Sequence, residues 1–263
     1  MTAARIELRG VGVDFGTLAA LRHLDLAIAP GSFVAVVGES GCGKSTLLRT
    51  IAGLVAPTSG SVEVDGVTPD GFRRRKQVAW MAQRAALLPW RTALENVALA
   101  QQVNPRPDRP GPDPATLLAM VGLGDFAGAY PSTLSGGMQQ RVSLARTLAI
   151  GAGVWLMDEP FAALDEMTRE TLADDVLDLW RRFRPTVVWV THHLPEAVKL
   201  ADRVVLLSPR PGSVAADIAV GLARPRDETE MPFQAVVRRA RAVLRGEPED
   251  AGTRPWAVEM GRK

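Results

Sequence analysis

The chain is 263 residues long, and its 46% hydrophobic and 23% charged residues are the balance of an ordinary globular protein, not of a disordered or membrane-embedded one. The formal net charge of +2 is too small to indicate a nucleic-acid partner, and we expect none. A single cysteine, Cys42, excludes an internal disulfide. Because the sequence opens without a secretory signal and has no apolar run of about 20 residues, which a membrane-spanning helix needs, we expect a protein of the reducing cytosol.

The first part of the chain predicts strands followed by a helix. Residues 6–13 and 21–28 alternate between apolar and polar positions, which is typical of antiparallel strands with one solvated face. Residues 32–37 (SFVAVV) form a short apolar run typical of a strand buried on both faces of a parallel sheet. Residues 45–54 have helical spacing. A small antiparallel sheet is therefore expected before the main fold.

The rest of the chain predicts an α/β fold with a helical insertion. Further strands are expected at residues 61–64, 77–81, 154–157, 186–190 and 204–207, with helices between several of them. Between residues 90 and 150 the strand signals disappear, and helices are expected at residues 93–101, 114–121 and 138–150. The five prolines of residues 104–114 predict a surface loop within this insertion. We expect a domain over residues 1–224 with a helical subdomain at about 90–150, and a tail over 225–263 that has one helix and a partly disordered polar end.

A phosphate-binding loop is the strongest motif in the sequence. Residues 38–45 read GESGCGKS, which fits G-x-x-x-x-G-K-[ST] and lies between the predicted buried strand and helix. Its glycines let backbone N–H groups point at phosphate oxygens, Lys44 can reach the β- and γ-phosphates, and the Ser45 hydroxyl can bind Mg²⁺. An accidental turn is the alternative, and the flanking strand and helix argue against it. The candidate ATP-binding residues of this segment are Gly38, Glu39, Ser40, Gly41, Cys42, Gly43, Lys44, Ser45 and Thr46.

Two acids follow the apolar run VWLM of residues 154–157. Asp158 can hold Mg²⁺ through water, and Glu159 can polarise an attacking water molecule. Acids are also common at the start of a loop that follows a strand. The functional interpretation of this pair therefore depends on the phosphate loop, which lies at the same end of a parallel sheet.

A second glycine-containing helix start occurs at residues 134–141, LSGGMQQR. Ser135 is a natural N-cap, and the two glycines would let a phosphate approach the backbone closely. Taken alone, this segment is more consistent with a simple capped helix.

Together these motifs, in this order, resemble those of the ABC ATPases over about residues 5–210. LSGGMQQR resembles the family's signature motif, which implies that Ser135, Gly136, Gly137 and Gln139 contact ATP. The resemblance implies a P-loop NTPase fold with a RecA-like core, an N-terminal antiparallel β subdomain and an inserted α-helical subdomain. ATP and Mg²⁺ are the implied substrate and cofactor.

The resemblance also implies roles for four residues that spacing alone does not single out. Phe15 would stack on adenine, where a tyrosine is commoner; Gln83 resembles the Q-loop glutamine that contacts Mg²⁺ or the water. Asp165 resembles the D-loop aspartate, and His192 the switch histidine that holds the γ-phosphate. His193 stands where many relatives carry an acid, which leaves open which histidine faces the phosphate. Without the family, Gln83 and His192 would be an ordinary surface glutamine and a strand-end histidine.

In this family two copies associate head-to-tail, so the signature of one chain completes the site of the other. The resemblance therefore implies a homodimer bound to transmembrane permease subunits at the cytoplasmic face of a bacterial-type inner membrane, served indirectly by an extracytoplasmic solute-binding protein. Residues 87–90 (LLPW) would offer apolar surface to the permease, although Trp90 is equally consistent with a core aromatic. LLPW and residues 207–212 (LSPRPG) resemble the importers of nitrate, sulfonates and taurine.

The main alternative is a soluble ABC ATPase of DNA repair or translation. Such relatives usually carry tandem ATPase domains or long coiled-coil insertions, and this sequence shows neither. A P-loop kinase would leave the LSGG segment unexplained.

Overall fold

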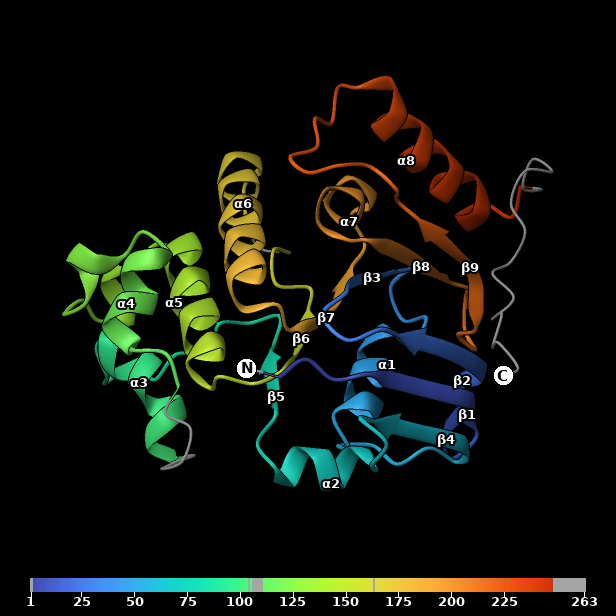
Figure 1. Cartoon of the computed structure of the whole chain (residues 1–263), viewed down its shortest axis with the longest axis horizontal. Coiled ribbons are helices and arrows are strands. Elements are labelled where there is room, and N and C mark those ends of the chain that lie inside the picture. Colours follow the sequence, from blue (N-terminus) through green and yellow to red (C-terminus); the bar gives the residue numbers. More distant parts are fainter. Residues whose placement is uncertain (1, 104, 106–110, 163, 248–263) are drawn as a thin grey trace, which may run out of the picture.

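A six-stranded sheet forms the centre of the fold and separates a layer of helices from a smaller sheet (Figure 1). The computed structural model describes residues 2–103, 105, 111–162 and 164–247. The central strand order is β5-β6-β7-β3-β8-β9, parallel except for β9, which pairs antiparallel with β8. These strands are β3 (Phe33–Val37), β5 (Val78–Met81), β6 (Val154–Asp158), β7 (Thr186–Thr191), β8 (Arg203–Leu207) and β9 (Val214–Ala219).

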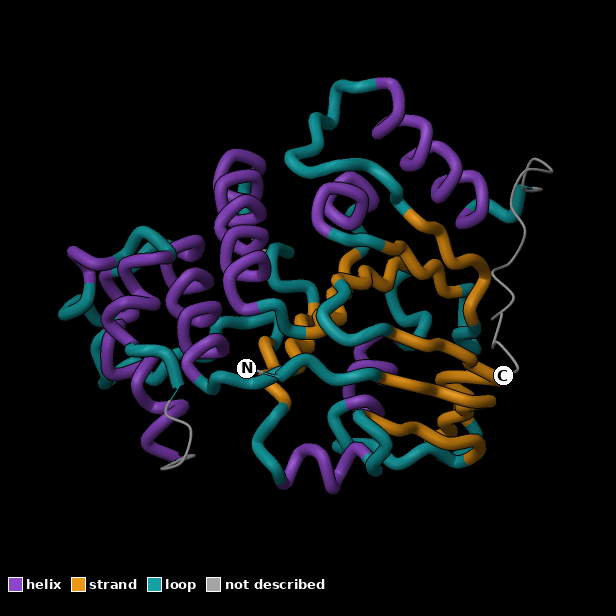
Figure 2. The backbone as a smooth tube through the Cα atoms, in the orientation of Figure 1, coloured by secondary structure: helices purple, strands orange, loops and turns teal. Residues whose placement is uncertain are grey.

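A three-stranded antiparallel sheet with the order β2-β1-β4 covers one face, together with α1 and α2 (Figure 2). Helices α6, α7 and α8 lie beside the other face, and α3, α4 and α5 form a separate helical group. The small sheet comprises β1 (Ile6–Phe15), β2 (Leu18–Ile28) and β4 (Ser59–Val64). The helices are α1 (Lys44–Ile51), α2 (Pro69–Arg74), α3 (Ala93–Val103), α4 (Pro114–Met120), α5 (Gly136–Ala149), α6 (Glu166–Phe183), α7 (Leu194–Leu200) and α8 (Met231–Leu244), with single 3₁₀ turns at Gly124–Phe126 and Pro131–Thr133.

The central strands divide their side chains between two cores. In β3, Phe33 and Ala35 belong to the core shared with the helices, whereas Val34 and Val36 belong to the core shared with α1 and the small sheet. Every β3 residue is buried, as expected for a strand covered on both faces. A shift of one residue would exchange the two sets, so this packing fixes the register that positions the loop after Val37.

The α/β fold class, the small antiparallel sheet and the helical subdomain are confirmed. The predicted strands and helices are present with small shifts of their ends; the helix of the LSGG segment, for example, begins at Gly136 rather than Met138. β9 and α2 were not expected, because neither has a strong apolar pattern. The expected loop at residues 104–114 lies largely outside the described residues, and so does the polar end at 248–263.

His193 caps α7, which follows directly on β7. Its Nδ1 accepts a hydrogen bond from the backbone N–H of Glu196 at 3.3 Å, the role that Asp or Asn usually plays at a helix start. Burial, and then the positive charge of Arg169, lowers the pKa of His193. The neutral ring is therefore the form that the fold favours, and it is also the form that can accept this hydrogen bond.

We expect the His193 cap to make stability depend on pH. Because the folded pKa lies below the unfolded value of about 6.5, the contribution is present above pH 6.5 and is lost as the pH falls through the folded pKa. His193→Asn keeps a cap that does not titrate, so its urea unfolding midpoint should fall less between pH 7.5 and pH 5 than that of the wild type. His193→Ala should lose about 1 kcal/mol of unfolding free energy at pH 7.5.

Glu196, whose pKa burial raises, changes stability in the opposite direction with pH, but all three proteins share it and the comparison cancels it. Parallel pH profiles for the wild type and His193→Asn would refute the lowered pKa of His193, and a His193→Ala protein as stable as the wild type at pH 7.5 would refute the capping role.

Candidate active site

The loop between β3 and α1 is shaped by glycines and held by Lys44. Gly41 and Gly43 have φ values of +79° and +110°, which side-chain-bearing residues rarely adopt. A Cβ at Gly43 would also lie 2.7 Å from Leu21 Cδ2, so the loop packs directly on β2. The Lys44 ammonium is buried and donates to the carbonyls of Gly38 at 2.7 Å and Glu39 at 2.8 Å. Among the residues that the structure describes, no side chain caps the start of α1, so its first N–H groups are available to an anion.

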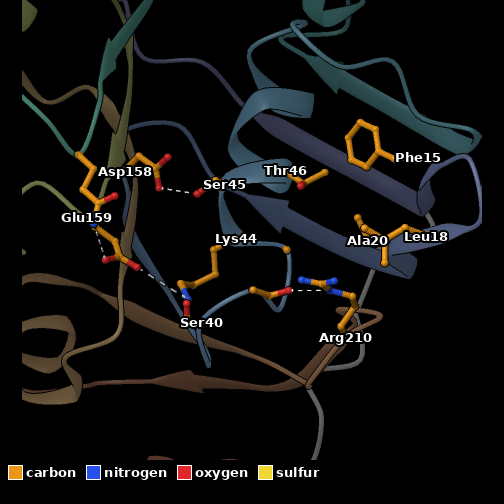
Figure 3. A pocket seen from close by; sticks show the side chains of 13 residues that line it. Phe15, Leu18, Ala20, Ser40, Lys44, Ser45, Thr46, Asp158, Glu159 and Arg210 are labelled. Atoms are coloured by element: carbon orange, nitrogen blue, oxygen red, sulfur yellow. Dashed lines mark hydrogen bonds and ion pairs between the residues drawn. The ribbon is translucent and has the colours of Figure 1, made fainter. Parts of the chain in front are cut away.

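A cavity of about 330 Å³ opens beside this loop. Figure 3 shows Phe15, Leu18 and Ala20 at one end and Asp158 and Glu159 at the other, with Lys44 and Ser45 between them. The cavity is lined by Phe15, Leu18, Ala20, Ser40, Gly41, Gly43, Lys44, Ser45, Thr46, Gln83, Asp158, Glu159 and Arg210. An apolar end and a polar end in one cavity suit a ligand with a flat base and a phosphate chain.

Asp158, at the end of β6, lies next to the start of α1. Its Oδ1 accepts a hydrogen bond from Ser45 Oγ at 2.9 Å. Burial raises the pKa of Asp158, so this carboxylate gains from a nearby cation. The hydroxyl of Ser45, the carboxylate of Asp158 and the amide oxygen of Gln83 are hard oxygen donors of the kind that Mg²⁺ prefers. In the described part of the chain no three His, Cys, Asp or Glu side chains group to hold a metal.

Glu159 stands where three functional side chains meet. Its carboxylate accepts from Gln83 Nε2 at 3.4 Å, faces His192 Nδ1 at 3.3 Å and lies 3.9 Å from Lys44 Nζ. Its φ of +46° is unusual for a non-glycine residue, and its N–H donates to Val190 of the neighbouring strand. Strained backbone of this kind persists where the surroundings hold it, and here it aims the carboxylate into the cavity.

The two adjacent histidines have different surroundings. His192 is 61% exposed and faces Glu159, whereas His193 is half-buried and caps α7. Of the two histidines, His192 is the one in contact with Glu159, which lines the cavity, and it stays the predicted phosphate ligand. Asp or Asn at position 193 could make the same cap, so the departure from the family's acid preserves the local structure.

Cys42 contributes backbone to the loop but not its thiol. Its side chain is 2% exposed and belongs to the core beneath the loop, where a Cβ on Gly38 would meet its Sγ at 2.7 Å. Burial raises the pKa of the thiol. The side chain therefore faces away from the cavity, which it does not line.

The LSGG segment lies at the start of α5 and does not line the cavity. Ser135 Oγ accepts a hydrogen bond from Met138 N at 3.3 Å, and Gly136 follows it as the first residue of the helix. A Cβ on Gly137 would lie 2.9 Å from Thr168 Cγ2, so this glycine packs closely against α6 of its own chain. Gln139 donates to the carbonyls of two preceding residues and so steadies the turn before the helix.

Asp165, the candidate D-loop aspartate, also lies outside the cavity lining. Its side chain caps α6, accepting from Thr168 N at 2.9 Å and from Thr168 Oγ1 at 2.7 Å. Within one chain, therefore, the structure brings together the phosphate loop, Phe15, Gln83 and the two acids, but not the LSGG segment or Asp165.

Leu18, Ala20 and Arg210 line the cavity and were not expected from the sequence. Leu18 and Ala20 lie at the start of β2, just after Phe15 at the end of β1, so a tight hairpin between these two strands could have placed them near it. Arg210 lies after β8, and no spacing rule connects it to the phosphate loop.

Comparison with known proteins identifies relatives of this chain. The ABC transporter family model matches residues 21–162. An aliphatic sulfonates import ATP-binding protein (SsuB 1) of Xanthomonas axonopodis is 43% identical over 93% of this chain and 96% of its own length. A nitrate import ATP-binding protein (NrtD) of Synechocystis is 44% identical over 81% of this chain and 79% of its own length.

A solved structure adds to these relatives. The ATP-binding cassette MJ0796, in a dimeric post-hydrolysis state bound to ADP and phosphate, has a TM-score of 0.71 and 34% identity, and the match covers 81% of this chain and 98% of that one. Fold, motif geometry and sequence similarity agree, and the chain belongs to the ABC transporter family of ATP-binding proteins.

Proposed function

We propose that this chain is the ATP-binding and ATP-hydrolysing subunit of an importer for a small anion such as nitrate, a sulfonate or taurine. The observation that carries the enzymatic part is the convergence of Lys44, Gln83 and His192 on the Glu159 carboxylate at the polar end of the cavity. A general base, a phosphate-binding cation and two polar orienting groups are the parts that phosphoryl transfer to water requires.

The proposed chemistry assigns one task to each side chain. Phe15 stacks on the base, the glycine loop and Lys44 bind the phosphates, and Glu159 accepts a proton from the attacking water. His192 donates to a γ-phosphate oxygen, while Gln83 orients the water. Mg²⁺, held by Ser45 and Asp158 with Gln83 nearby, would neutralise negative charge on the β- and γ-phosphates.

We further propose that two copies associate head-to-tail, so that Ser135 and Gly137 of one copy complete the phosphate site of the other. The separation of the LSGG segment from its own cavity supports this, as does the dimeric state of the similar cassette. Asp165 would lie at the contact between the copies. ATP would stabilise the closed dimer because its phosphates contact both copies only in that state.

The importer assignment rests on relatives named for sulfonate and nitrate import, which also make a soluble repair or translation ATPase the weaker alternative. No helix among the described residues has the length and apolar character to cross a membrane. Trp90 is 71% exposed, so its reading as a core aromatic is wrong, and it is available to a permease subunit on the cytoplasmic side of the membrane. A solute-binding protein would deliver the anion. We retain residues 1–224 as the ATPase domain and 225–263 as a tail.

Glu159→Gln is expected to retain MgATP binding and to lose hydrolysis by a factor of about 10²–10⁴, because the amide cannot accept the proton. With hydrolysis blocked, MgATP should convert the variant to a dimer in size-exclusion chromatography with light scattering. Phosphate release and nucleotide binding are measured in parallel.

The matched control is Glu170→Gln, the same change on the exposed side of α6, which should hydrolyse ATP at the wild-type rate. A Glu159→Gln protein with wild-type turnover would remove Glu159 as the base.

The composite site predicts complementation between two inactive variants. Ser135→Asp keeps the α5 cap but places a negative charge opposite the partner's γ-phosphate, and Lys44→Ala disables the phosphate loop. Each variant alone should be inactive, whereas an equal mixture should recover about a quarter of the wild-type ATPase rate, since half of the dimers are mixed and each has one intact site.

Ser135→Asn, which caps α5 without the charge, separates electrostatic repulsion from helix damage and should be more active than Ser135→Asp. A mixture no more active than its two components would contradict the shared site.

A further inference from the structure

Arg210 approaches the phosphate loop from a segment distant in sequence. It lies between β8 and β9, and its Nε donates to the Gly41 carbonyl at 2.9 Å across a separation of 169 residues. Its Nη2 would lie 2.9 Å from a Cβ on Gly41, so the guanidinium rests directly on this glycine. Figure 3 shows Arg210 on the side of the cavity that carries Leu18 and Ala20, opposite Asp158 and Glu159.

The segment that carries Arg210 is fixed on both sides. Gly212 N donates to Ala20 O, and Arg22 N donates to Gly212 O, both at 3.0 Å, which pins the segment to β2. A Cβ on Gly212 would lie 2.1 Å from Cys42 O, so the backbone also packs against the phosphate loop. Ser208 Oγ closes the turn by bonding to Ser213 N. These contacts fix the turn that holds Arg210 at the cavity.

The positive charges of the cavity lie on two side chains, and Arg210 is one of them. Among the described lining residues, Lys44 and Arg210 are the two with a positive charge. Lys44 lies toward the end of the cavity that contains Glu159, and its ammonium is 3.9 Å from that carboxylate. Arg210 is exposed, and its guanidinium has five N–H donors, of which the Gly41 carbonyl uses the one on Nε.

We infer that Arg210 binds the nucleotide, its Nη groups contacting the phosphate chain near the ribose while its Nε keeps hold of the Gly41 carbonyl. This inference rests on the proposed function, because it takes the base to lie at Phe15 and the terminal phosphate at Lys44. Guanidinium groups form strong, directional hydrogen bonds with phosphate, and one anchored in advance loses little conformational entropy on binding. Arg210 acts on affinity and not on the hydrolytic step, since it lies away from Glu159.

The test measures nucleotide affinity with Arg210→Gln in the full-length protein. Dissociation constants for MgATP and MgADP should both increase by about five- to tenfold, because the contact is to a phosphate that the two share. The kcat should stay within about twofold of the wild type, so the loss appears in KM. The matched control is Arg22→Gln, which removes an exposed arginine from β2 and leaves its backbone contact to Gly212 in place.

Inorganic tripolyphosphate, in competition with a fluorescent nucleotide, separates a phosphate contact from one to ribose or base. If Arg210 contacts phosphate, Arg210→Gln should weaken tripolyphosphate binding by a factor similar to that for ATP. Unchanged tripolyphosphate affinity, or equal ATP affinity in Arg210→Gln and the wild type, would overturn the inference. A wild-type protein that binds no MgATP would instead refute the proposed function, which distinguishes the two failures.

Discussion

The hydrogen bond from Ser45 to Asp158 joins the two parts of the chain on which the site depends. Ser45 lies in the first turn of α1, which the phosphate loop connects to β3, and Asp158 ends β6. β7 lies between these strands, and His192 follows its last residue. Because the three strands are parallel, their carboxyl ends share one edge of the sheet. Phosphate loop, acids and histidine therefore meet there as a consequence of strand order and register.

The residues that could be predicted are those whose role follows from local sequence. The GESGCGKS loop and the two acids each follow a buried apolar strand. The sequence pattern that predicts each strand therefore also predicts where the residues after it lie. The left-handed backbone of Glu159 could not be predicted, because nothing in its neighbours requires it; the hydrogen bond to Val190 holds it. Arg210 was missed for a related reason, since its place depends on how the segment after β8 packs against β2.

Helix starts show how tertiary context alters a sequence signal. Asp165 matched a family position near ATP, yet within the chain its carboxylate caps α6. His193 stands where many relatives carry an acid, yet its ring caps α7 as an acid could. In both cases the capping role uses backbone N–H groups that a sequence motif does not reveal. A side chain can therefore occupy a position of the family's motifs and also cap a helix of its own chain.

The starts of α1 and α5 both have backbone N–H groups that can bind an anion, but the two starts differ in whether a side chain caps them. No described side chain caps α1, and its first residues line the cavity. At α5, Ser135 Oγ accepts from Met138 N and is exposed, which leaves its hydroxyl hydrogen free to donate outward. One helix start is thus prepared for an anion in its own chain, and the other presents its donors away from that cavity. In the proposed head-to-tail dimer, the α5 start of one copy would therefore complete the phosphate site in the cavity of the other.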